Sequence, residues 1–324
     1  MIRAICVAGD SHTWGQGTAD EVFKNFEIPV REGEKRLLPF RVPSFPSLLR
    51  NYINKNSGSE AIELSGAEII EQYGLAQKSE CAYVCGELCI NEPFDFARIE
   101  LKKGSQDAEI LCDETVVQTF HADRCDDYEV INVMPEHSGN RLVIRSSNAL
   151  LYRVELYRGQ YAVVNCGIGS CPSSRYTTDY LDKYVLQISP YMVIAEIFTV
   201  NDWITCRSAQ ECEQNLLKFG KRIIEHGAKL AFASVIPILG KQENSFGTDY
   251  SEYVQAGACA AKLLNVPYAD TYRAFSKEYA VDPQTAHYGD AWHPGSRGHE
   301  IYFEEIKKLD MVNELFKASH YGNT

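Results

Sequence analysis

The sequence predicts an α/β protein with a parallel sheet, interrupted by an inserted all-β segment. Short, wholly apolar runs have the length of buried parallel strands, and amphipathic patterns of helical period lie between them. Between about residues 66 and 158 the pattern changes to a period of two, which is typical of antiparallel strands. We therefore expect a discontinuous α/β domain, 1–65 and 159–324, around a β-sandwich domain, 66–158.

The parallel sheet is predicted from four apolar runs, at 4–8, 161–165, 192–198 and 229–236. The clearest helix is predicted over 211–226, where apolar residues recur at helical spacing and Gly227 follows as a terminating glycine. Two further helices are predicted over 250–264 and 298–309. Strand–helix–strand repeats imply right-handed crossovers and a parallel sheet, which binds ligands at the carboxyl ends of its strands.

The insert is predicted from alternating side chains and from turns. The alternating set along 150–157 is Leu150, Tyr152, Val154 and Leu156 against Leu151, Arg153, Glu155 and Tyr157, and Leu142 and Ile144 flank Val143 in the same way. Segments rich in turn-forming residues interrupt the stretch at 102–107, 121–127 and 135–140. Several short strands at this spacing favour a β-sandwich of jelly-roll type.

Composition narrows the classes of function. The chain has 324 residues and a formal net charge of -12, with 45% apolar and 23% charged residues. No block rich in Lys or Arg is present, so we expect no nucleic-acid partner. No run approaches the ~18 consecutive apolar residues of a membrane span, so we expect no membrane partner. The N-terminus lacks the pattern of a secretory signal, which favours a cytoplasmic location.

The 11 cysteines predict a reducing compartment, because the number is odd and several lie in apolar runs. Cys81, Cys85 and Cys89 have a uniform four-residue spacing that would align the thiols on one helical face. That spacing differs from the paired cysteines of zinc sites, and the surrounding residues favour a strand. We expect no metal here.

Ser11 lies in VAGDSHTWGQG (7–17), directly after the first predicted strand. Taken alone, a serine at this place favours an N-cap, whose hydroxyl accepts a hydrogen bond from a free backbone N–H. A nucleophile additionally needs a base within hydrogen-bond reach and donors for the oxyanion. The rest of the chain decides between these alternatives.

The C-terminal stretch DAWHPGSRGH (290–299) offers the base. Asp290 and His293 are three residues apart in a loop rich in Pro and Gly, so the carboxylate can orient the imidazole. Two other segments follow predicted strands: NCGIGS, which contains Gly167, and TVND, which contains Asn201. The backbone N–H of Gly167 and the side-chain amide of Asn201 could donate to an oxyanion, together with the N–H of Ser11.

Taken in chain order, the segments that contain Ser11, Gly167, Asn201 and His293 resemble the four blocks of the SGNH hydrolase superfamily, also called GDSL esterases and lipases. The resemblance covers about 230 residues and leaves out the β insert. It implies a three-layer α/β/α fold of flavodoxin type, no metal or cofactor, and ester hydrolysis through an acyl-enzyme. It also implies the roles of the residues. Ser11 would be the nucleophile, His293 the base and Asp290 the acid that orients it. The oxyanion donors would be Ser11, Gly167 and Asn201.

The sequence departs from the family pattern at two places. Thr199 and Val200 precede Asn201, where the family often has Gly, and His12 follows Ser11, where Leu or Ile is common. His12 could compete with His293 for the role of base; the family places its base after a nearby Asp close to the C-terminus, which favours His293.

The expected substrate is a short-chain ester, with acetyl preferred, on a carbohydrate. A jelly-roll insert beside such a site resembles carbohydrate esterases, and tryptophans stack on sugar faces. The candidate substrate-binding residues are His12, Trp14, Trp203 and Trp292. Alternatives are a lipase or thioesterase for longer acyl chains, an acyltransferase with the same residues, and a non-catalytic glycan-binding protein. The sequence does not determine the oligomeric state.

Overall fold

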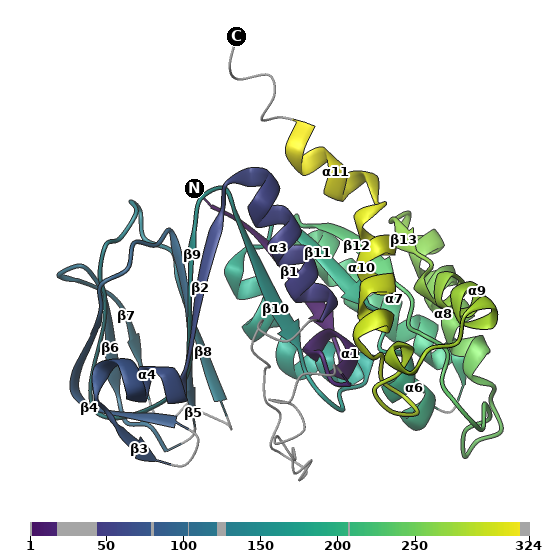
Figure 1. Cartoon of the computed structure of the whole chain (residues 1–324), viewed down its shortest axis with the longest axis horizontal. Coiled ribbons are helices and arrows are strands. Elements are labelled where there is room, and N and C mark those ends of the chain that lie inside the picture. Colours follow the sequence, from purple (N-terminus) through teal and green to yellow (C-terminus); the bar gives the residue numbers. More distant parts are fainter. Residues whose placement is uncertain are drawn as a thin grey trace. The chain divides into compact units, whose positions relative to one another are not determined.

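The computed structural model of the chain describes residues 2–17, 44–78, 81–102, 104–121, 128–206 and 208–317. The chain divides into two compact units. The α/β unit comprises 4–53 and 163–324, and the β unit comprises 1–3 and 54–162. Figure 1 shows their elements, which we describe unit by unit.

The α/β unit is built on a five-stranded sheet with the strand order β10-β1-β11-β12-β13. The strands are β10 (Tyr161–Gly167), β1 (Arg3–Gly9), β11 (Met192–Glu196), β12 (Lys229–Ala233) and β13 (Tyr268–Ala269). The last four pair in parallel, with Val7 opposite Ile194 and Ala195 opposite Phe232. Every residue of β11 is buried, as expected for a central parallel strand. The predicted α/β class, with its mostly parallel sheet, is confirmed.

The helices follow the predicted pattern. The predicted helix 211–226 is α7 (Ala209–Glu225), which begins after Ser208, whose side chain accepts from the Glu211 N–H. The predicted 250–264 is α8 (Tyr250–Leu264), and the predicted 298–309 overlaps α10 (Ser296–Lys307). The other helices in the described part of this unit are α1 (Ser11–Trp14), α3 (Phe45–Ser57, which runs into the β unit), α5 (Ser173–Arg175), η2 (Tyr176–Val185), η3 (Leu186–Ile188), α6 (Thr199–Thr205), α9 (Thr271–Val281), η4 (Thr285–His287) and α11 (Asp310–Lys317).

Helices α7 and α8 pack against each other and against β12, which buries the apolar face of α7. Within the described ranges, no helix combines the length and the apolar character that crossing a membrane requires.

The β unit is an antiparallel sheet of eight strands organised around β9 (Leu142–Arg158). One part of β9 pairs with β4 (Cys81–Ile90) and β6 (Ala108–Cys112), and the other with β2 (Glu60–Ser65) and β5 (Phe96–Lys102). The other elements are β3 (Ala76–Lys78), β7 (Thr115–Phe120), β8 (Tyr128–Val133) and the helix α4 (Gly66–Tyr73). The strands confirm the β character of the segment, whereas its jelly-roll topology stays a prediction.

The β unit starts earlier than the sequence predicted. It includes residues from Asn54 onward, ahead of the expected boundary at 66, and it ends at Ala162 rather than 158. The reason is β2, which pairs with β9 from Glu60 opposite Arg158 to Ser65 opposite Arg153. A strand of six residues carries too little periodicity to show from the sequence which sheet it joins.

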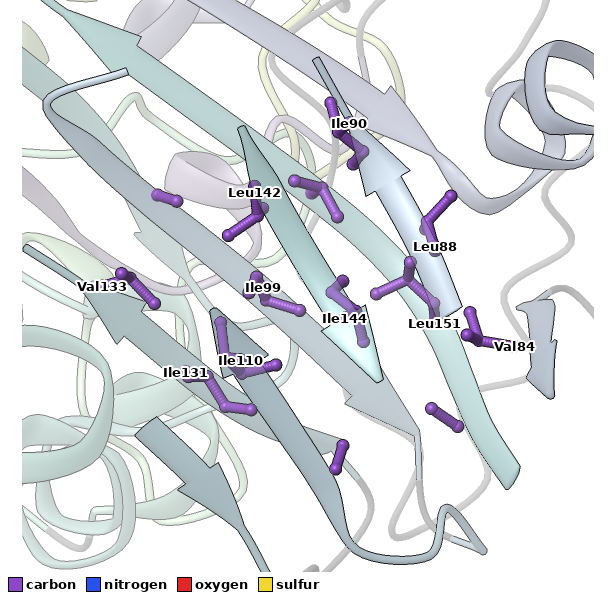
Figure 2. Packing of buried hydrophobic residues seen from close by; sticks show 14 of the residues in the cluster. Val84, Leu88, Ile90, Ile99, Ile110, Ile131, Val133, Leu142, Ile144 and Leu151 are labelled. Carbon is purple, nitrogen blue, oxygen red and sulfur yellow. The ribbon is translucent and has the colours of Figure 1, made fainter. Parts of the chain in front are cut away.

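The core of the β unit lies on one face of its sheet, and a β-bulge changes which residues of β9 reach it. Figure 2 shows this packing, with Ile99 and Ile144 near its centre. The register between β5 and β9 shifts between Glu100 and Leu101. Leu151 and Val154 therefore both face the core, while Tyr152 lies in a separate small cluster. An extra residue at a bulge reverses the side-chain alternation, so the regular period of two predicted along 150–157 does not continue through it.

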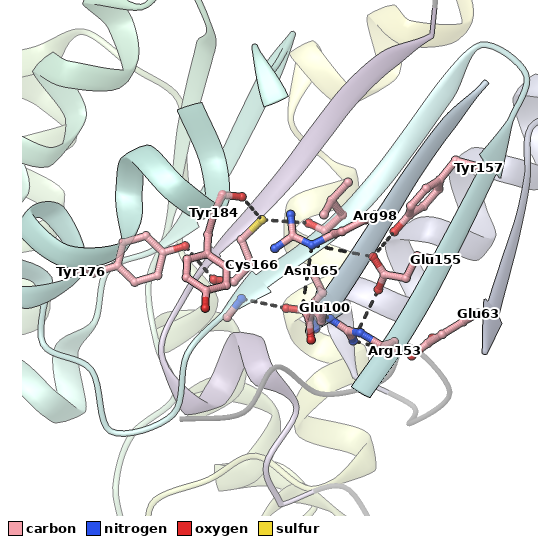
Figure 3. A network of polar contacts seen from close by, with 12 residues as sticks. Glu63, Arg98, Glu100, Arg153, Glu155, Tyr157, Asn165, Cys166, Tyr176 and Tyr184 are labelled. Atoms are coloured by element: carbon pink, nitrogen blue, oxygen red, sulfur yellow. Dashed lines mark hydrogen bonds and ion pairs between the residues drawn. The ribbon is translucent and has the colours of Figure 1, made fainter. Parts of the chain in front are cut away.

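The other face of this part of the sheet carries buried charges, drawn in Figure 3. Arg153 of β9 contacts Glu100 at 2.7 Å, Glu155 at 3.4 Å and Glu63 at 3.6 Å, and all four side chains are at most 3% exposed. Arg98 of β5 lies 3.9 Å from Glu100. Because a buried charge without a partner is strongly destabilising, these residues act as one network. The carboxylates raise the pKa of Arg153, against the effect of its burial.

The three cysteines of the uniform spacing lie on β4, as the strand-like surroundings indicated. Cys81 is buried and Cys85 is exposed. All cysteines in the part of the chain that the structure describes are free thiols.

Candidate active site

Ser11 is the first residue of α1, at the carboxyl end of β1. The cap of this helix is its neighbour Asp10, whose Oδ1 accepts a hydrogen bond from the His12 N–H at 3.0 Å. The Ser11 hydroxyl is therefore not needed as a cap. Its Oγ lies 3.0 Å from Nε2 of His293. Of the two alternatives that the sequence left open, this geometry favours the nucleophile.

Asp290 and His293 lie in the loop between η4 and α10. His293 Nδ1 lies 2.7 Å from Oδ2 and 2.9 Å from Oδ1 of Asp290. Oδ1 also accepts the backbone N–H groups of Trp292 and His293, each at 2.8 Å. Because Nδ1–H donates to a carboxylate, Nε2 presents its lone pair to the Ser11 hydroxyl. The three predicted residues thus form a hydrogen-bonded triad within the α/β unit.

The loop environment favours the ionised form of Asp290. Partial burial alone would raise the pKa of this carboxyl group. The hydrogen bond and the charge of His293, together with the two backbone N–H donors, outweigh burial and lower the pKa to about 2. The carboxylate is therefore charged throughout the pH range in which an imidazole base works.

Asn201 reaches the same region from α6, which follows β11. Its Nδ2 donates to Oδ2 of Asp10 at 2.6 Å. The Asp10 N–H in turn donates to Oε2 of Glu196, the last residue of β11, at 3.2 Å. Burial and the adjacent Asp10 carboxylate raise the pKa of Glu196 well above its usual range. Asp10 therefore orients Asn201, and a protonated Glu196 supports Asp10.

Gly167 does not have the predicted arrangement. Its N–H donates to Oδ1 of Asn165 at 2.9 Å, so this donor is already engaged. The glycine has another cause: a Cβ here would lie 2.3 Å from the backbone N of Trp14, so only glycine lets α1 approach the end of β10. Tyr176 Oη also fixes this strand end, donating to the Cys166 carbonyl at 2.6 Å (Figure 3).

His12 and Trp14 are not at the surface where a substrate could contact them. His12 is fully buried, and both of its ring nitrogens are engaged by other groups of the protein. Trp14 is 2% exposed and packs with its ring against Gly169. The prediction that these two side chains bind substrate is therefore wrong, because α1 turns both of them into the interior.

Trp292 and Trp203 are placed differently. Trp292, between Asp290 and His293 in sequence, is 41% exposed. Trp203 is 8% exposed, and its ring meets that of Trp292 edge to face, with centroids 6.3 Å apart. Trp203 Nε1 donates to the Gln242 carbonyl at 3.1 Å, which fixes the inner ring. Of the four predicted substrate-binding residues, Trp292 offers the largest accessible aromatic surface, with Trp203 behind it.

Gly17 is a structural contributor to the site that the sequence analysis missed. Its φ is +95°, and a Cβ at this residue would lie 2.7 Å from the Cβ of His293 and 2.6 Å from the Pro294 carbonyl oxygen. The backbones at Gly17 and Gly289 also approach closely. Gly17 therefore packs directly on the loop that carries Asp290 and His293. The sequence signal was the GQG that ends the first motif.

Asp10, His12 and Glu196 bring potential metal-ligand atoms within 4.8 Å of one another. Hydrogen bonds already engage these potential ligand atoms. Both His12 nitrogens have partners, and Glu196 accepts a hydrogen bond from the Asp10 N–H. We therefore interpret the group as a hydrogen-bonded support beneath Ser11.

Comparisons with known proteins place this geometry in context. No family model and no curated protein matches the sequence. Among solved structures, a peptidoglycan O-acetylesterase matches with a TM-score of 0.59 and 13% identity, over 98% of this chain and 92% of that chain. An acetyl-xylooligosaccharide esterase variant from Geobacillus matches with a TM-score of 0.48 and 13% identity, over 94% and 93%. A lipase/acylhydrolase from Enterococcus faecalis matches with 0.39 and 23% identity, over 49% and 77%.

The first of these similarities, at a TM-score above 0.5, shows a shared fold. The α/β fold expected from the resemblance to SGNH hydrolases is therefore the fold of the chain.

Proposed function

We propose that the chain is a serine ester hydrolase of the SGNH type that removes short acyl groups, acetyl above all, from a carbohydrate. The observation that carries the proposal is the triad, with Ser11 Oγ 3.0 Å from His293 Nε2 and His293 Nδ1 2.7 Å from Asp290. A hydroxyl, a neutral imidazole and a carboxylate in this order are the arrangement of an activated serine nucleophile.

The reaction follows from the positions of these atoms. As Ser11 Oγ attacks the ester carbonyl, its proton moves to His293 Nε2, and the ionised Asp290 stabilises the imidazolium. When the tetrahedral intermediate collapses, the alcohol leaves with the proton from Nε2, and the acyl group stays on Ser11. A water molecule then gives a proton to Nε2 and attacks the acyl carbonyl. That proton returns to Ser11 Oγ as the carboxylic acid is released.

Two of the three predicted oxyanion donors fit this scheme. The Ser11 N–H belongs to the first turn of α1, where backbone N–H groups have no partner within the helix. The Asn201 amide, oriented by Asp10, carries a second N–H beyond the one that Asp10 accepts. The third donor, Gly167, would have to leave Asn165 to take part.

The substrate class rests on Trp292 and on the matching structures. An exposed indole next to the base suits the apolar face of a sugar ring, which aromatic side chains bind by stacking. The peptidoglycan O-acetylesterase that shares the fold acts, by its name, on acetyl groups of a glycan. We expect Trp292 to hold the sugar and the Ser11–Asn201 side to hold the acyl oxygen.

The decisive experiment compares wild type with Ser11→Ala on p-nitrophenyl acetate. We expect turnover in the wild type and its loss in the variant, with the thermal midpoint preserved. A second serine on the same unit, Ser251→Ala, is the matched control and should keep full turnover. An active Ser11→Ala protein would overturn the proposal.

A panel of esters separates the alternatives within this chemistry. Esters of increasing chain length, compared by kcat/KM, should favour acetyl. A preference for long chains would instead indicate a lipase or thioesterase. Acyl transfer to an added sugar in place of water would indicate an acyltransferase. Glycan binding without turnover in the wild type would support a non-catalytic protein.

A cytoplasmic location stays part of this proposal.

A further inference from the structure

His12 is the residue that the proposed chemistry leaves without a role. Its side chain is buried, although it follows the nucleophile directly. Nε2 lies 2.8 Å from the carbonyl oxygen of Trp292, and Nδ1 lies 3.1 Å from the hydroxyl of Tyr302 on α10. A fully enclosed imidazole with two polar partners is held in one position and touches no substrate.

The partners determine where the proton of this ring lies. A carbonyl oxygen only accepts hydrogen bonds, so Nε2 carries the hydrogen. Burial lowers the pKa of His12, which favours the neutral ring, and Nδ1 then has a lone pair. The Tyr302 hydroxyl therefore donates to Nδ1. Tyr302 is itself fixed, because its side chain is fully buried and its ring stacks on Phe45 with centroids 4.8 Å apart.

His12 and Asp290 hold opposite ends of one peptide group. In the peptide between Trp292 and His293, the carbonyl accepts from His12 Nε2 at 2.8 Å, and the N–H donates to Asp290 Oδ1 at 2.8 Å. The rings of His12 and His293 also meet edge to face, with centroids 5.5 Å apart. The backbone that enters the base is therefore fixed on both sides.

We propose that His12 is a positioning residue that sets the distance between Ser11 and His293. Ser11 and His12 are consecutive on α1, so the bond from His12 to the Trp292 carbonyl ties the helix of the nucleophile to the loop of the base. The proposal rests on the proposed function, because it assigns His12 a part in activating Ser11. Without this bond the loop shifts relative to Ser11, and the contact between Ser11 and His293 lengthens.

The kinetic test uses His12→Leu, His12→Gln and Tyr302→Phe. Leucine cannot donate, and we expect kcat on p-nitrophenyl acetate to fall by about 10- to 100-fold, the size of effect that a small misplacement of reacting groups produces. KM should stay within about twofold, because His12 touches no substrate. Glutamine, whose Nε2 can donate to the Trp292 carbonyl, should restore most of kcat. Tyr302→Phe should give an intermediate loss, since the imidazole then keeps the Trp292 carbonyl as a partner but loses the one at Nδ1. The control is the exposed His226→Gln.

A second readout requires no turnover. Nitrogen-15 NMR of the imidazole groups in the wild type should show His12 as the neutral Nε2–H form. The low-field proton of His293 Nδ1–H, bonded to Asp290, should be sharp in the wild type and in His226→Gln, and weakened in His12→Leu. These spectra keep the positioning role testable if Ser11 proves not to be a nucleophile.

Three results would overturn the proposal: a wild-type kcat in a folded His12→Leu protein, an Nδ1–H tautomer at His12, or a glutamine variant as impaired as the leucine variant. If His12→Leu does not fold, the test rests on His12→Gln and Tyr302→Phe. A wild-type kcat in Tyr302→Phe, together with a kcat in His12→Gln as low as that expected for His12→Leu, would equally contradict the proposal.

Discussion

The Ser11 hydroxyl lies 3.0 Å from His293 Nε2, although the two residues are 282 positions apart in the chain. Ser11 is placed by the end of β1 and the Asp10 cap, and His293 by the hydrogen bonds that Asp290 accepts within its own loop. Local structure thus fixes each residue. Their meeting depends on the packing of α1 and of Gly17 against the loop that carries Asp290 and His293.

Asp290→Asn should lower kcat/KM by between about 10²- and 10⁴-fold, because an amide does not stabilise the imidazolium. In the wild type, the Asp290 pKa of about 2 means that this carboxyl stays ionised above pH 4. Ionisation of Asp290 should therefore add no limb to the dependence of activity on pH in this range. The pH profile of kcat/KM from pH 4 to 8 checks this.

The matched control for that variant is Asp182→Asn, which alters a surface carboxylate paired with Arg222 and should leave the profile unchanged. A limb of slope two in the wild type would show a second essential group and contradict the assignment.

Gly17→Ala should lower kcat by about tenfold or more, because its Cβ would lie 2.7 Å from the Cβ of His293 and push the base away from Ser11. Gly227→Ala is the matched control: its φ of +91° is similar to the +95° of Gly17, but its Cβ would meet open space. Both variants carry backbone strain, so both should lose some thermal stability. Only Gly17→Ala should lose activity, and equal kcat values would contradict the packing argument.

Glu196→Gln should keep near-wild-type kcat, because glutamine resembles the protonated acid and still offers an oxygen to the Asp10 N–H. Glu196→Ala removes that acceptor in a fully buried place, which leaves Asp10 and hence Asn201 less well oriented. We expect about a tenfold loss of kcat, less than the roughly 10²- to 10³-fold that complete removal of an oxyanion donor costs. Steady-state kinetics of the two variants check this; a severe loss in Glu196→Gln would show that the ionised carboxylate is needed.

Asp202 should make the stability of the fold depend on pH. Burial raises its pKa from 3.8 to about 7, although Ser173 and Cys212 donate hydrogen bonds to it. The folded state thus holds this proton more tightly than the unfolded state. The stability from that proton is complete below pH 3.8 and is lost as the pH rises towards 7. The loss is on the order of 4 kcal/mol.

Asp202→Asn removes this dependence. The free energy of unfolding in urea, measured at pH 5 and pH 8, should therefore fall more in the wild type than in the variant. An equal fall in both proteins would contradict a raised pKa at Asp202.

Much of the fold could be predicted from local patterns. The apolar runs predicted the strands of the parallel sheet, and the helical spacing predicted α7 and α8 closely. The patterns failed where pairing decided the outcome. The sequence of β2 does not show that its partner is β9, and the alternation along β9 does not show the bulge near Tyr152. The pairing of β2 and the bulge in β9 both depend on strands that are distant in sequence, and the periodicity of one segment does not reveal them.

By itself, the sequence determined which residues carry the candidate chemistry. Ser11 and Asn201 lie in segments that follow strands, and Asp290 and His293 share a loop rich in Pro and Gly. Tertiary structure alone decided which groups are engaged and which are exposed. In the folded chain the Gly167 N–H donates to Asn165, and the side chains of His12 and Trp14 are buried. Trp292 lies at the surface, and Gly17 packs against His293. The physical reason is that hydrogen-bond partners and burial depend on which segments pack together, whereas a residue's chemical type is present in the chain before it folds.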